Sequence, residues 1–438
     1  MKPFLNPEVF KITIPESERE LPIYWVTPPV LAALLNPEST LLAAPSGYGK
    51  STLALIARQQ LSDDWFHVRL KNREDADENL INQLLSQITQ EMWSYIEEHP
   101  AVLAGLQQTR AVAARYFLQR LSDIDINFLL ARLAEDEPDH AEAIEAFRAI
   151  QPGELFSASA SNTQRLSVLC DCVQKLGSQG IFIWIDLSTE LAHLSHPFLQ
   201  TLQSLFDSLH LMRRRTLHIK CLALPSVCRY LQTLRGVETL SVNRLTLQWT
   251  AEQMIHLIEQ RLTLASAHSI NSLAQLVAPA ECITFLESFS DVGSPVEWLT
   301  LARLIVEKVN ATEQYPLSQA DWLSVRRSYC VERVKLRLDE QGSFWRGKQL
   351  LTDLTPKKRA LYPLLKYLYE HPGVHRTYTL TGVLDVDETN LNTMVSRVRK
   401  EHLEPFLPTE EEGEEAWIYL VTDFKGGGYT LVNTLRSP

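Results

Sequence analysis

The sequence lacks the features that would direct a chain of 438 residues to a membrane, a secretory route or a metal-stabilised scaffold. No apolar run approaches the roughly 20 residues that a membrane-spanning helix needs. Met1 to Phe10 lacks the basic-then-apolar order of a secretory signal. The six cysteines form no Cys-x-x-Cys pair, which is typical of a reduced chain without a zinc or disulfide framework. We therefore expect a cytoplasmic protein with no membrane partner.

An excess of basic residues is also absent. The chain has 42 Lys and Arg against 53 Asp and Glu, a net charge of −11. A protein that binds nucleic acid over its whole surface would be basic, so any DNA contact must be local. What is present is an ordinary globular composition, 45% hydrophobic and 22% charged, with enough apolar material for real cores. At about 150 residues per domain, the length predicts roughly three domains.

Short apolar runs alternate with helical periodicity along the first part of the chain. The pattern predicts strands over residues 39–44, 65–70, 180–186, 217–224 and 237–242, and helices over 30–35, 50–61 and 79–93. Strands separated by helices predict a parallel sheet that is covered on both faces. The stretch from about 96 to 165 is almost wholly helical, and so is the stretch from 250 to 308.

A phosphate-binding loop is expected between the first strand and the next helix. Glycines there let the backbone approach phosphate oxygens, and the helix N-terminus offers unpaired N–H groups and a positive dipole end. We expect Lys50 to pair with the β- and γ-phosphates of ATP or ADP and the Ser51 hydroxyl to ligate Mg²⁺. The residues expected to bind the nucleotide are Ala44, Pro45, Ser46, Gly47, Tyr48, Gly49, Lys50, Ser51 and Thr52. Ala44 stands where the usual motif has its first glycine.

Asp186 closes the apolar run of residues 180–186, at the place where such folds hold Mg²⁺ through water. The alternative for a carboxylate at a strand end is to cap the following helix. Hydrolytic versions of the site usually carry a second acidic residue directly after the aspartate, but here that residue is Leu187 and the nearest acid is Glu190. Asp186 and Glu190 are therefore the candidate catalytic residues, and we expect at most a slow ATPase.

These motifs resemble those of STAND-type signalling NTPases, notably the maltose-activator-like regulators, which are relatives of the AAA+ class. The resemblance covers about residues 25–310. It is carried by 41–52, 65–70 with 77–80, the 180–186 strand, 242–245 leading into 250–253, and Gly293-Ser-Pro295 followed by 298–302. It implies an α/β P-loop NTPase core with helices on both faces of a parallel sheet, a helical lid and a homo-oligomer.

The sequence departs from that family in three places. The second acidic residue after Asp186 is absent, and the arginine that usually ends the next strand is replaced by Ala223-Leu-Pro-Ser226. The helical stretch of about 96–165 is interpreted as an insertion. AAA+ relatives place a trans-acting arginine on the helix before the last strand, where Arg229 and Arg235 are the candidates; the alternative is that both are solvated helix charges.

Residues 342–435 resemble the winged helix of OmpR-type response regulators. The matching segments are 344–350, 354–361, 370–373, 392–400 and a wing at 425–431. A first helix is expected from Thr355-Pro356 to about Glu370, with the proline in its first turn. The third helix would present Asn390, Thr393, Arg397 and Lys400 to a major groove, while Lys425 at the wing tip would touch phosphate or the minor groove.

The charge of this module opposes DNA binding by a single copy. From Glu340 to the end there are 12 Lys and Arg and 14 Asp and Glu, a balance of 12 − 14 = −2, and the acidic run Glu410 to Glu415 precedes the wing. Phosphate neutralisation supplies much of DNA affinity, so the module is a poor non-specific binder. It either reads DNA as part of an oligomer or contacts a protein partner instead.

The sequence therefore predicts four segments: an arm at 1–20, a P-loop core at 21–248, a helical lid at 249–331 and a winged helix domain at 332–438. The expected function is that of a switch in which nucleotide state and oligomerisation control DNA binding, as in transcription regulators. The alternative is a nucleotide-binding scaffold or adaptor of a defence or mobile-element system whose winged helix contacts protein.

Overall fold

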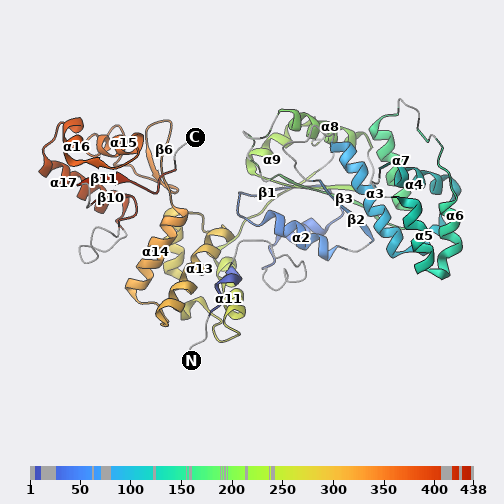
Figure 1. Cartoon of the computed structure of the whole chain (residues 1–438), viewed down its shortest axis with the longest axis horizontal. Coiled ribbons are helices and arrows are strands. Elements are labelled where there is room, and N and C mark those ends of the chain that lie inside the picture. Colours follow the sequence, from blue (N-terminus) through green and yellow to red (C-terminus); the bar gives the residue numbers. More distant parts are fainter. Residues whose placement is uncertain are drawn as a thin grey trace. The chain divides into compact units, whose positions relative to one another are not determined.

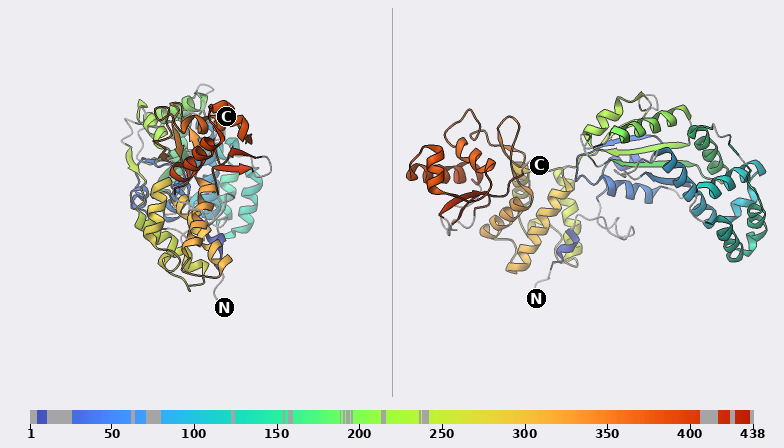
Figure 2. Two further views of the ribbon diagram at one scale, coloured as in Figure 1. Left: turned by 90° about the vertical axis from the view of Figure 1, so that its left-hand side faces the viewer. Right: turned by 45° about the horizontal axis from the view of Figure 1, so that its top comes forward.

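The computed structural model describes two compact units (Figures 1 and 2). The described residues are 5–10, 26–61, 64–70, 80–121, 125–153, 155–156, 160–187, 189, 191, 194, 196–212, 216–235, 237, 242–405, 417–423 and 427–435. One unit is built mainly from Thr27–Gln248, and the other from Trp249–Pro438 together with the N-terminal residues 5–10. Among these residues, none of the helices combines the length and the apolar character that crossing a bilayer requires.

The first unit is built on a five-stranded parallel sheet. The strands are β1 (Thr40–Ala43), β2 (Trp65–Leu70), β3 (Gly180–Leu187), β4 (Leu217–Ala223) and β5 (Asn243–Thr246), in the order β2-β3-β4-β1-β5. All of β4 is buried, and along β3 only Asp186 is partly exposed, which is why both strands consist of nearly unbroken apolar runs. The parallel sheet expected from the sequence is confirmed.

Helices cover both faces of this sheet. Figure 1 shows α2 on one face and α8 and α9 on the other. The helices of the unit are α1 (Val30–Leu35), α2 (Lys50–Gln60), α3 (Leu80–Glu98), α4 (Gln108–Leu121), α5 (Ile126–Asp136), α6 (Ala141–Arg148), α7 (Asn162–Lys175), α8 (His196–Met212) and α9 (Pro225–Gln232), with short 3-10 turns η3 (Pro100–Gly105) and η4 (Pro138–His140). A capping box formed by Ser161 and Gln164 begins α7, the helix that leads back into β3.

The strand expected at residues 237–242 was wrongly placed. The fifth strand is β5, which begins at Asn243 and pairs with β1 in the register Thr40↔Asn243 to Ala43↔Thr246. Because β5 lies at the edge of the sheet, its residues are alternately half-buried and exposed rather than continuously apolar. Val237 is buried in the core without belonging to a strand, and residues 238–241 lie outside the described part of the chain.

The second unit begins with a group of helices that we call the helical segment. It comprises α11 (Ala251–Ala265), η6 (Leu273–Gln275), α12 (Pro279–Phe289), α13 (Pro295–Thr312) and α14 (Gln319–Arg333). The N-terminal turn η1 (Pro7–Phe10) packs on it, with Leu5 and Phe10 fully buried. The Asn310 amide accepts from the Leu5 N–H at 3.0 Å and donates to the Leu5 carbonyl at 2.7 Å, which fixes this N-terminal piece on α13.

The remaining residues, 334–435, form the C-terminal domain. Two three-stranded sheets accompany three helices: β6 (Leu336–Leu338), β7 (Phe344–Arg346), β8 (Gln349–Leu350), α15 (Tyr362–Glu370), β9 (His375–Arg376), α16 (Thr377–Leu384), α17 (Glu388–Arg397), the π-helical turn η7 (Val398–Leu403), β10 (Leu420–Asp423) and β11 (Gly428–Leu431). The strands β10 and β11 pair antiparallel, and β11 lies within the segment 425–431 that was expected to form the wing.

The helix expected from Thr355 to Glu370 begins later, at Tyr362. A helix that started at Thr355 would place Pro363 in its interior, where proline removes a hydrogen bond and clashes with the preceding turn. In the structure Pro363 lies in the first turn of α15, where its missing N–H costs nothing. The helix therefore does begin with a proline in its first turn, as expected, but this proline is Pro363 and not Pro356.

Candidate nucleotide-binding site

The loop between β1 and α2 is shaped by its glycines. Gly47 and Gly49 both have φ of +80°, a left-handed conformation that only glycine adopts without strain. The loop is anchored at its start because the Ala44 N–H donates to the Ala223 carbonyl at 3.0 Å. Gly49 is the N-cap residue of α2, and no side chain caps that helix end. A helix N-terminus without a side-chain cap, with its N–H groups and positive dipole end, suits an anion.

Lys50 turns its ammonium back into this loop. The residue is only 5% exposed, and Nζ donates to the Ala44 carbonyl at 3.0 Å and to the Pro45 carbonyl at 2.9 Å. These bonds hold a positive charge inside the turn that Gly47 and Gly49 form. A fixed cation and a helix N-terminus that no side chain caps together fit the phosphates of a nucleotide.

Ser51 and Asp186 are brought together from distant parts of the sequence. The Ser51 hydroxyl donates to the Asp186 carboxylate, which joins the first turn of α2 to the end of β3. Hydroxyl and carboxylate oxygens are the hard ligands that Mg²⁺ takes, usually with water and substrate phosphates completing its shell. Within the described chain no three His, Cys, Asp or Glu side chains gather into a metal site of their own. The pair thus fits a cation that arrives with a nucleotide.

The other loop residues differ in exposure. Ser46 is exposed, Thr52 is half-buried and Tyr48 is buried, with only 7% of its surface exposed. A bound Mg²⁺–nucleotide would supply a polarised, charge-neutralised phosphoryl group. The chain's own contribution would be to orient the phosphates with Lys50 and the loop N–H groups and to hold the cation near Ser51 and Asp186.

The catalytic half of the site has no acid next to Asp186. Leu187 is 1% exposed and packs in the apolar core of the first unit, because successive residues of a strand point to opposite faces. Glu190, the other catalytic candidate, lies outside the described residues. Among the described residues, we therefore assign no side chain the role of activating water beside Asp186.

The two arginine candidates lie on and beyond α9. Arg229 is exposed, and its Nε donates to the Pro225 carbonyl of its own helix at 3.4 Å. Arg235 is exposed after the end of α9. Their expected role toward a neighbouring copy stays a prediction.

The thiols around the site are inert. Cys228 on α9 is buried, with Sγ 3.7 Å from the Leu42 carbonyl and 3.8 Å from the Ala223 carbonyl. Burial raises the pKa of Cys228 to about 11, although the nearby Lys50 charge acts in the opposite direction. Burial also raises the pKa of Cys221 well above its usual value. Both thiols stay protonated at neutral pH and act as packing groups.

Four of the five residues expected to read DNA are exposed on the C-terminal domain. Asn390, Thr393 and Arg397 lie on α17 and Lys400 on η7, whereas Lys425 lies outside the described residues. The Asn390 amide donates to the Asp387 carboxylate at 2.8 Å, and Arg397 pairs with Glu401 at 3.3 Å. Two of the expected contacts are thus already engaged with acidic neighbours.

Arg399, which no sequence pattern marked as functional, holds this surface together. It is 4% exposed, its Nε donates to the Leu420 carbonyl at 2.8 Å, and its guanidinium also donates to the Thr422 hydroxyl at 2.7 Å. These bonds fix η7 against β10. In the sequence Arg399 stands between Arg397 and Lys400, so no charge pattern distinguishes the buried cation from the exposed ones.

The sheet, the loop and the Ser51–Asp186 pair define the class of the first unit: it is an α/β P-loop NTPase core. The loop follows β1 and opens α2, and Asp186 stands at the carboxyl end of β3. Ligands of open parallel sheets bind at this edge.

Comparison with known proteins gives structural neighbours only. No protein-family model matches the chain, and no curated protein matches it. The chain is similar to the Holliday junction branch migration motor RuvB of Thermotoga maritima, with 12% identity and a TM-score of 0.32 over 98% of this chain and 93% of that one. It is similar to the ORC2 protein of Aeropyrum pernix in ADPNP–ADP complexes, with 11% identity and a TM-score of 0.39 over 99% and 95% of the two chains. It is also similar to Cdc6p of Pyrobaculum aerophilum, with 10% identity and a TM-score of 0.37 over 99% and 95% of the two chains. The class assigned above rests on the strand order and the loop.

Proposed function

We propose that this protein is a nucleotide-dependent switch of the STAND/AAA+ type that binds ATP or ADP with Mg²⁺ at the loop of residues 44–52. The observation that carries the proposal is the convergence of Lys50, the N-terminus of α2, which no side chain caps, and the Ser51–Asp186 pair at one edge of the sheet. Cation, donors and hard oxygen ligands are the three elements that a magnesium nucleotide needs.

The switch turns over slowly at most. The position after Asp186 carries the buried Leu187, and β4 ends at Ala223 without an arginine. A site that binds phosphates but lacks a group to orient water spends its time in nucleotide-bound states. Such behaviour suits a protein whose output depends on occupancy rather than on continuous hydrolysis.

The output we propose is DNA binding by the C-terminal domain, acting as a winged helix in a cytoplasmic homo-oligomer. The exposed side chains of Asn390, Thr393, Arg397 and Lys400 support it, since α17 is the helix that such a domain lays in the major groove. With a balance of −2 over residues 340–438, one copy neutralises few phosphates. An oligomer raises the effective concentration of further copies and recovers affinity without new contacts.

A second candidate output is contact with a protein partner, as in an adaptor of a defence or mobile-element system. One observation favours it: Asp385, Asp387 and Glu388 are exposed at the N-terminal end of α17. In helix-turn-helix proteins this end lies nearest the bases. Three carboxylates there oppose the approach of phosphates and suit a basic protein surface.

Gel-shift titrations of the full chain with duplex DNA, at low salt and with or without ATP and Mg²⁺, separate the two outputs. We expect a shift that needs nucleotide, rises steeply with protein concentration and falls with salt. Lys50→Ala should abolish the nucleotide dependence, and Arg397→Ala should weaken the shift at every nucleotide state. Lys357→Ala, which removes an exposed lysine of the C-terminal domain outside α17, is the control. No shift of any duplex by any form would contradict the DNA output and favour the protein partner.

A further inference from the structure

The helical segment and the C-terminal domain are connected without a free linker. The helix α14 ends at Arg333 and β6 begins at Leu336. Between them Val334 is 1% exposed, and its carbonyl accepts from the Tyr419 hydroxyl at 2.8 Å and from the Asn433 side-chain amide at 3.1 Å. Both donors belong to the C-terminal domain. The residues that connect α14 to β6 are therefore packed into the C-terminal domain directly after α14 ends.

A second connection joins the end of α12 to the turn between β7 and β8. The Lys348 N–H donates to the Phe289 carbonyl at 3.2 Å, and Lys348 Nζ pairs with Asp291 at 3.1 Å. Gly347 has φ of +57°, and a Cβ at this position would lie 2.5 Å from the Phe289 carbonyl oxygen. The two backbones therefore approach as closely as only glycine permits. We call these two connections together the joint.

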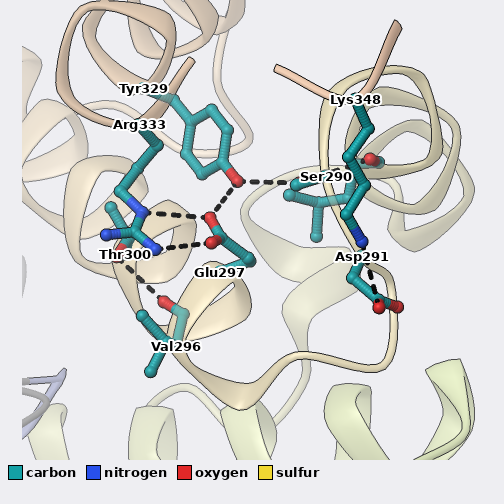
Figure 3. A network of polar contacts seen from close by, with 9 residues as sticks. Ser290, Asp291, Val296, Glu297, Thr300, Tyr329, Arg333 and Lys348 are labelled. Atoms are coloured by element: carbon teal, nitrogen blue, oxygen red, sulfur yellow. Dashed lines mark hydrogen bonds and ion pairs between the residues drawn. The ribbon is translucent and has the colours of Figure 1, made fainter. Parts of the chain in front are cut away.

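A polar network stiffens the helical segment beside the joint (Figure 3). The Tyr329 hydroxyl donates to Glu297 at 2.5 Å and lies 2.9 Å from the Ser290 hydroxyl, and Arg333 donates to the same carboxylate at 2.5 Å. Ser290 follows α12, Glu297 lies in the first turn of α13, and the other two residues belong to α14. The Glu297 carboxylate thus ties α13 to α14, and the Tyr329 hydroxyl extends the network to Ser290 at the end of α12.

A buried side chain of the C-terminal domain, Arg346, also reaches across the joint. Arg346 is 2% exposed; its guanidinium donates to the Leu403 carbonyl and lies 4.9 Å from the ring centre of Phe289, across the joint. Glu404 is 1% exposed and accepts from the N–H groups of Ile418 at 2.9 Å and Tyr419 at 2.8 Å. The partners of Glu404 all lie within the C-terminal domain, so of these two side chains only Arg346 contacts the helical segment. A shift of the helical segment against β7 would separate the Arg346 guanidinium from the Phe289 ring.

From these contacts we propose that the helical segment and the C-terminal domain form one rigid body, so that any displacement of α12–α14 carries α17 with it. Rigidity of the joint follows from the two connections, the Glu297 network and the contact of Arg346 with Phe289, and needs no nucleotide. The further statement that a change of nucleotide state displaces this rigid body rests on the proposed function. In that case the joint is the element through which the P-loop unit would control the surface formed by α17.

Pulsed electron paramagnetic resonance on the full chain tests the rigid body. Spin labels at Glu287→Cys on α12 and Glu388→Cys on α17 use exposed positions, and the six native cysteines are buried. We expect a single narrow distance distribution that is the same without nucleotide, with ADP–Mg²⁺ and with a non-hydrolysable ATP analogue. A broad distribution of label distances in the protein with an unmodified joint, or a label distance that changes with nucleotide, would overturn the proposal.

Gly347→Ala supplies the perturbation and Gly427→Ala its matched control. Both glycines have a left-handed φ, +57° and +61°, but a Cβ at Gly427 meets nothing within 4 Å. Backbone strain is thus equal in the two variants, and only Gly347→Ala forces the joint apart. We expect broadening of the label distance in Gly347→Ala alone. Equal distributions in the two variants would count against a joint that sets the arrangement.

Tyr419→Phe gives a second test in which the ring is kept and folding is preserved. It removes only the hydroxyl that donates to Val334, and we expect about fivefold faster amide exchange at Leu336 and Lys348, as the loss of one hydrogen bond of typical strength produces. Unchanged exchange at both amides would contradict the proposal. Failure of the proposed function is distinguishable, since it would appear as absent nucleotide binding in calorimetry while the narrow distance distribution persisted.

Discussion

Lys220 is a cation in the middle of a parallel sheet, and replacing it by methionine should make stability depend on pH in a specific way. The side chain is fully buried on β4, where Nζ donates to the Asn36 carbonyl at 2.7 Å and to the Thr40 hydroxyl at 3.2 Å. Burial lowers the pKa of Lys220 from 10.5 to about 8, although the charge of Glu38 opposes the change. Lys220→Met keeps the length of the side chain and removes the ammonium.

The magnitude follows from linkage. The difference between 10.5 and about 8, at 1.36 kcal/mol for each pKa unit, corresponds to about 3 kcal/mol of cost for burying the charged form. Because the pKa is lower in the folded state, this cost is fully present below pH 8 and disappears as the pH rises to 10.5. The variant also loses two hydrogen bonds, at about 1 kcal/mol each. Lys220→Met should therefore be about 1 kcal/mol more stable than the unmodified protein at pH 7 and about 2 kcal/mol less stable near pH 10.5.

Urea unfolding followed by tryptophan fluorescence measures this difference. Trp65 and Trp184 flank Phe182, over whose ring Lys220 lies at 5.3 Å, so their emission reports on the same part of the sheet. Lys357→Met, at an exposed lysine, controls for general effects of pH on the chain. A difference between Lys220→Met and the unmodified protein that stays constant from pH 7 to 10.5 would refute the assignment of a buried, charged lysine.

Three further outcomes are expected. Asp186→Asn should remove the magnesium-dependent part of nucleotide affinity measured by calorimetry; affinity that is equal with and without Mg²⁺ in the unmodified protein would contradict the pairing of Asp186 with the cation. Steady-state ATP turnover should lie below ~1 s⁻¹, the low end of typical enzymes, and turnover at tens per second would show that a water-orienting group was overlooked. Gly180→Ala should destabilise the first unit by about 1–3 kcal/mol, because the new Cβ would lie 2.4 Å from the Thr216 carbonyl oxygen and 2.5 Å from the Trp65 ring. Gly153→Ala, where a Cβ meets nothing within 4 Å, should leave thermal stability unchanged, and equal effects of the two variants would contradict the packing argument.

The sequence was most informative where local pattern and tertiary environment agree. The strand 65–70 and the helix 30–35 coincide with β2 and α1 residue for residue, since their apolar positions face the core that the pattern implies. The phosphate loop was predictable because its glycines are needed for left-handed backbone, a requirement of the loop alone. The pairing of Ser51 with Asp186, 135 residues apart, followed from the chemistry of a magnesium site.

Features that depend on distant partners were not predictable. The strand β5 is defined by its pairing with β1, and its own residues alternate too weakly to mark it. The buried cations Lys220, Arg346 and Arg399 look like surface residues in the sequence, because only the carbonyls that surround them in the fold make burial possible. The joint belongs to the same class, since every contact in it links segments far apart along the chain.

Isothermal titration calorimetry of the full chain with ADP and Mg²⁺ tests the central claim most directly. The account predicts saturable binding by the unmodified protein and by Lys357→Ala, and a loss of about 100-fold or more in Lys50→Ala, because the ammonium that Ala44 and Pro45 hold in the loop would make charge-assisted bonds to phosphate. Circular dichroism would establish that the variant is folded. Equal affinity of the unmodified protein and Lys50→Ala, or no binding by either, would contradict the assignment of this loop as a nucleotide site.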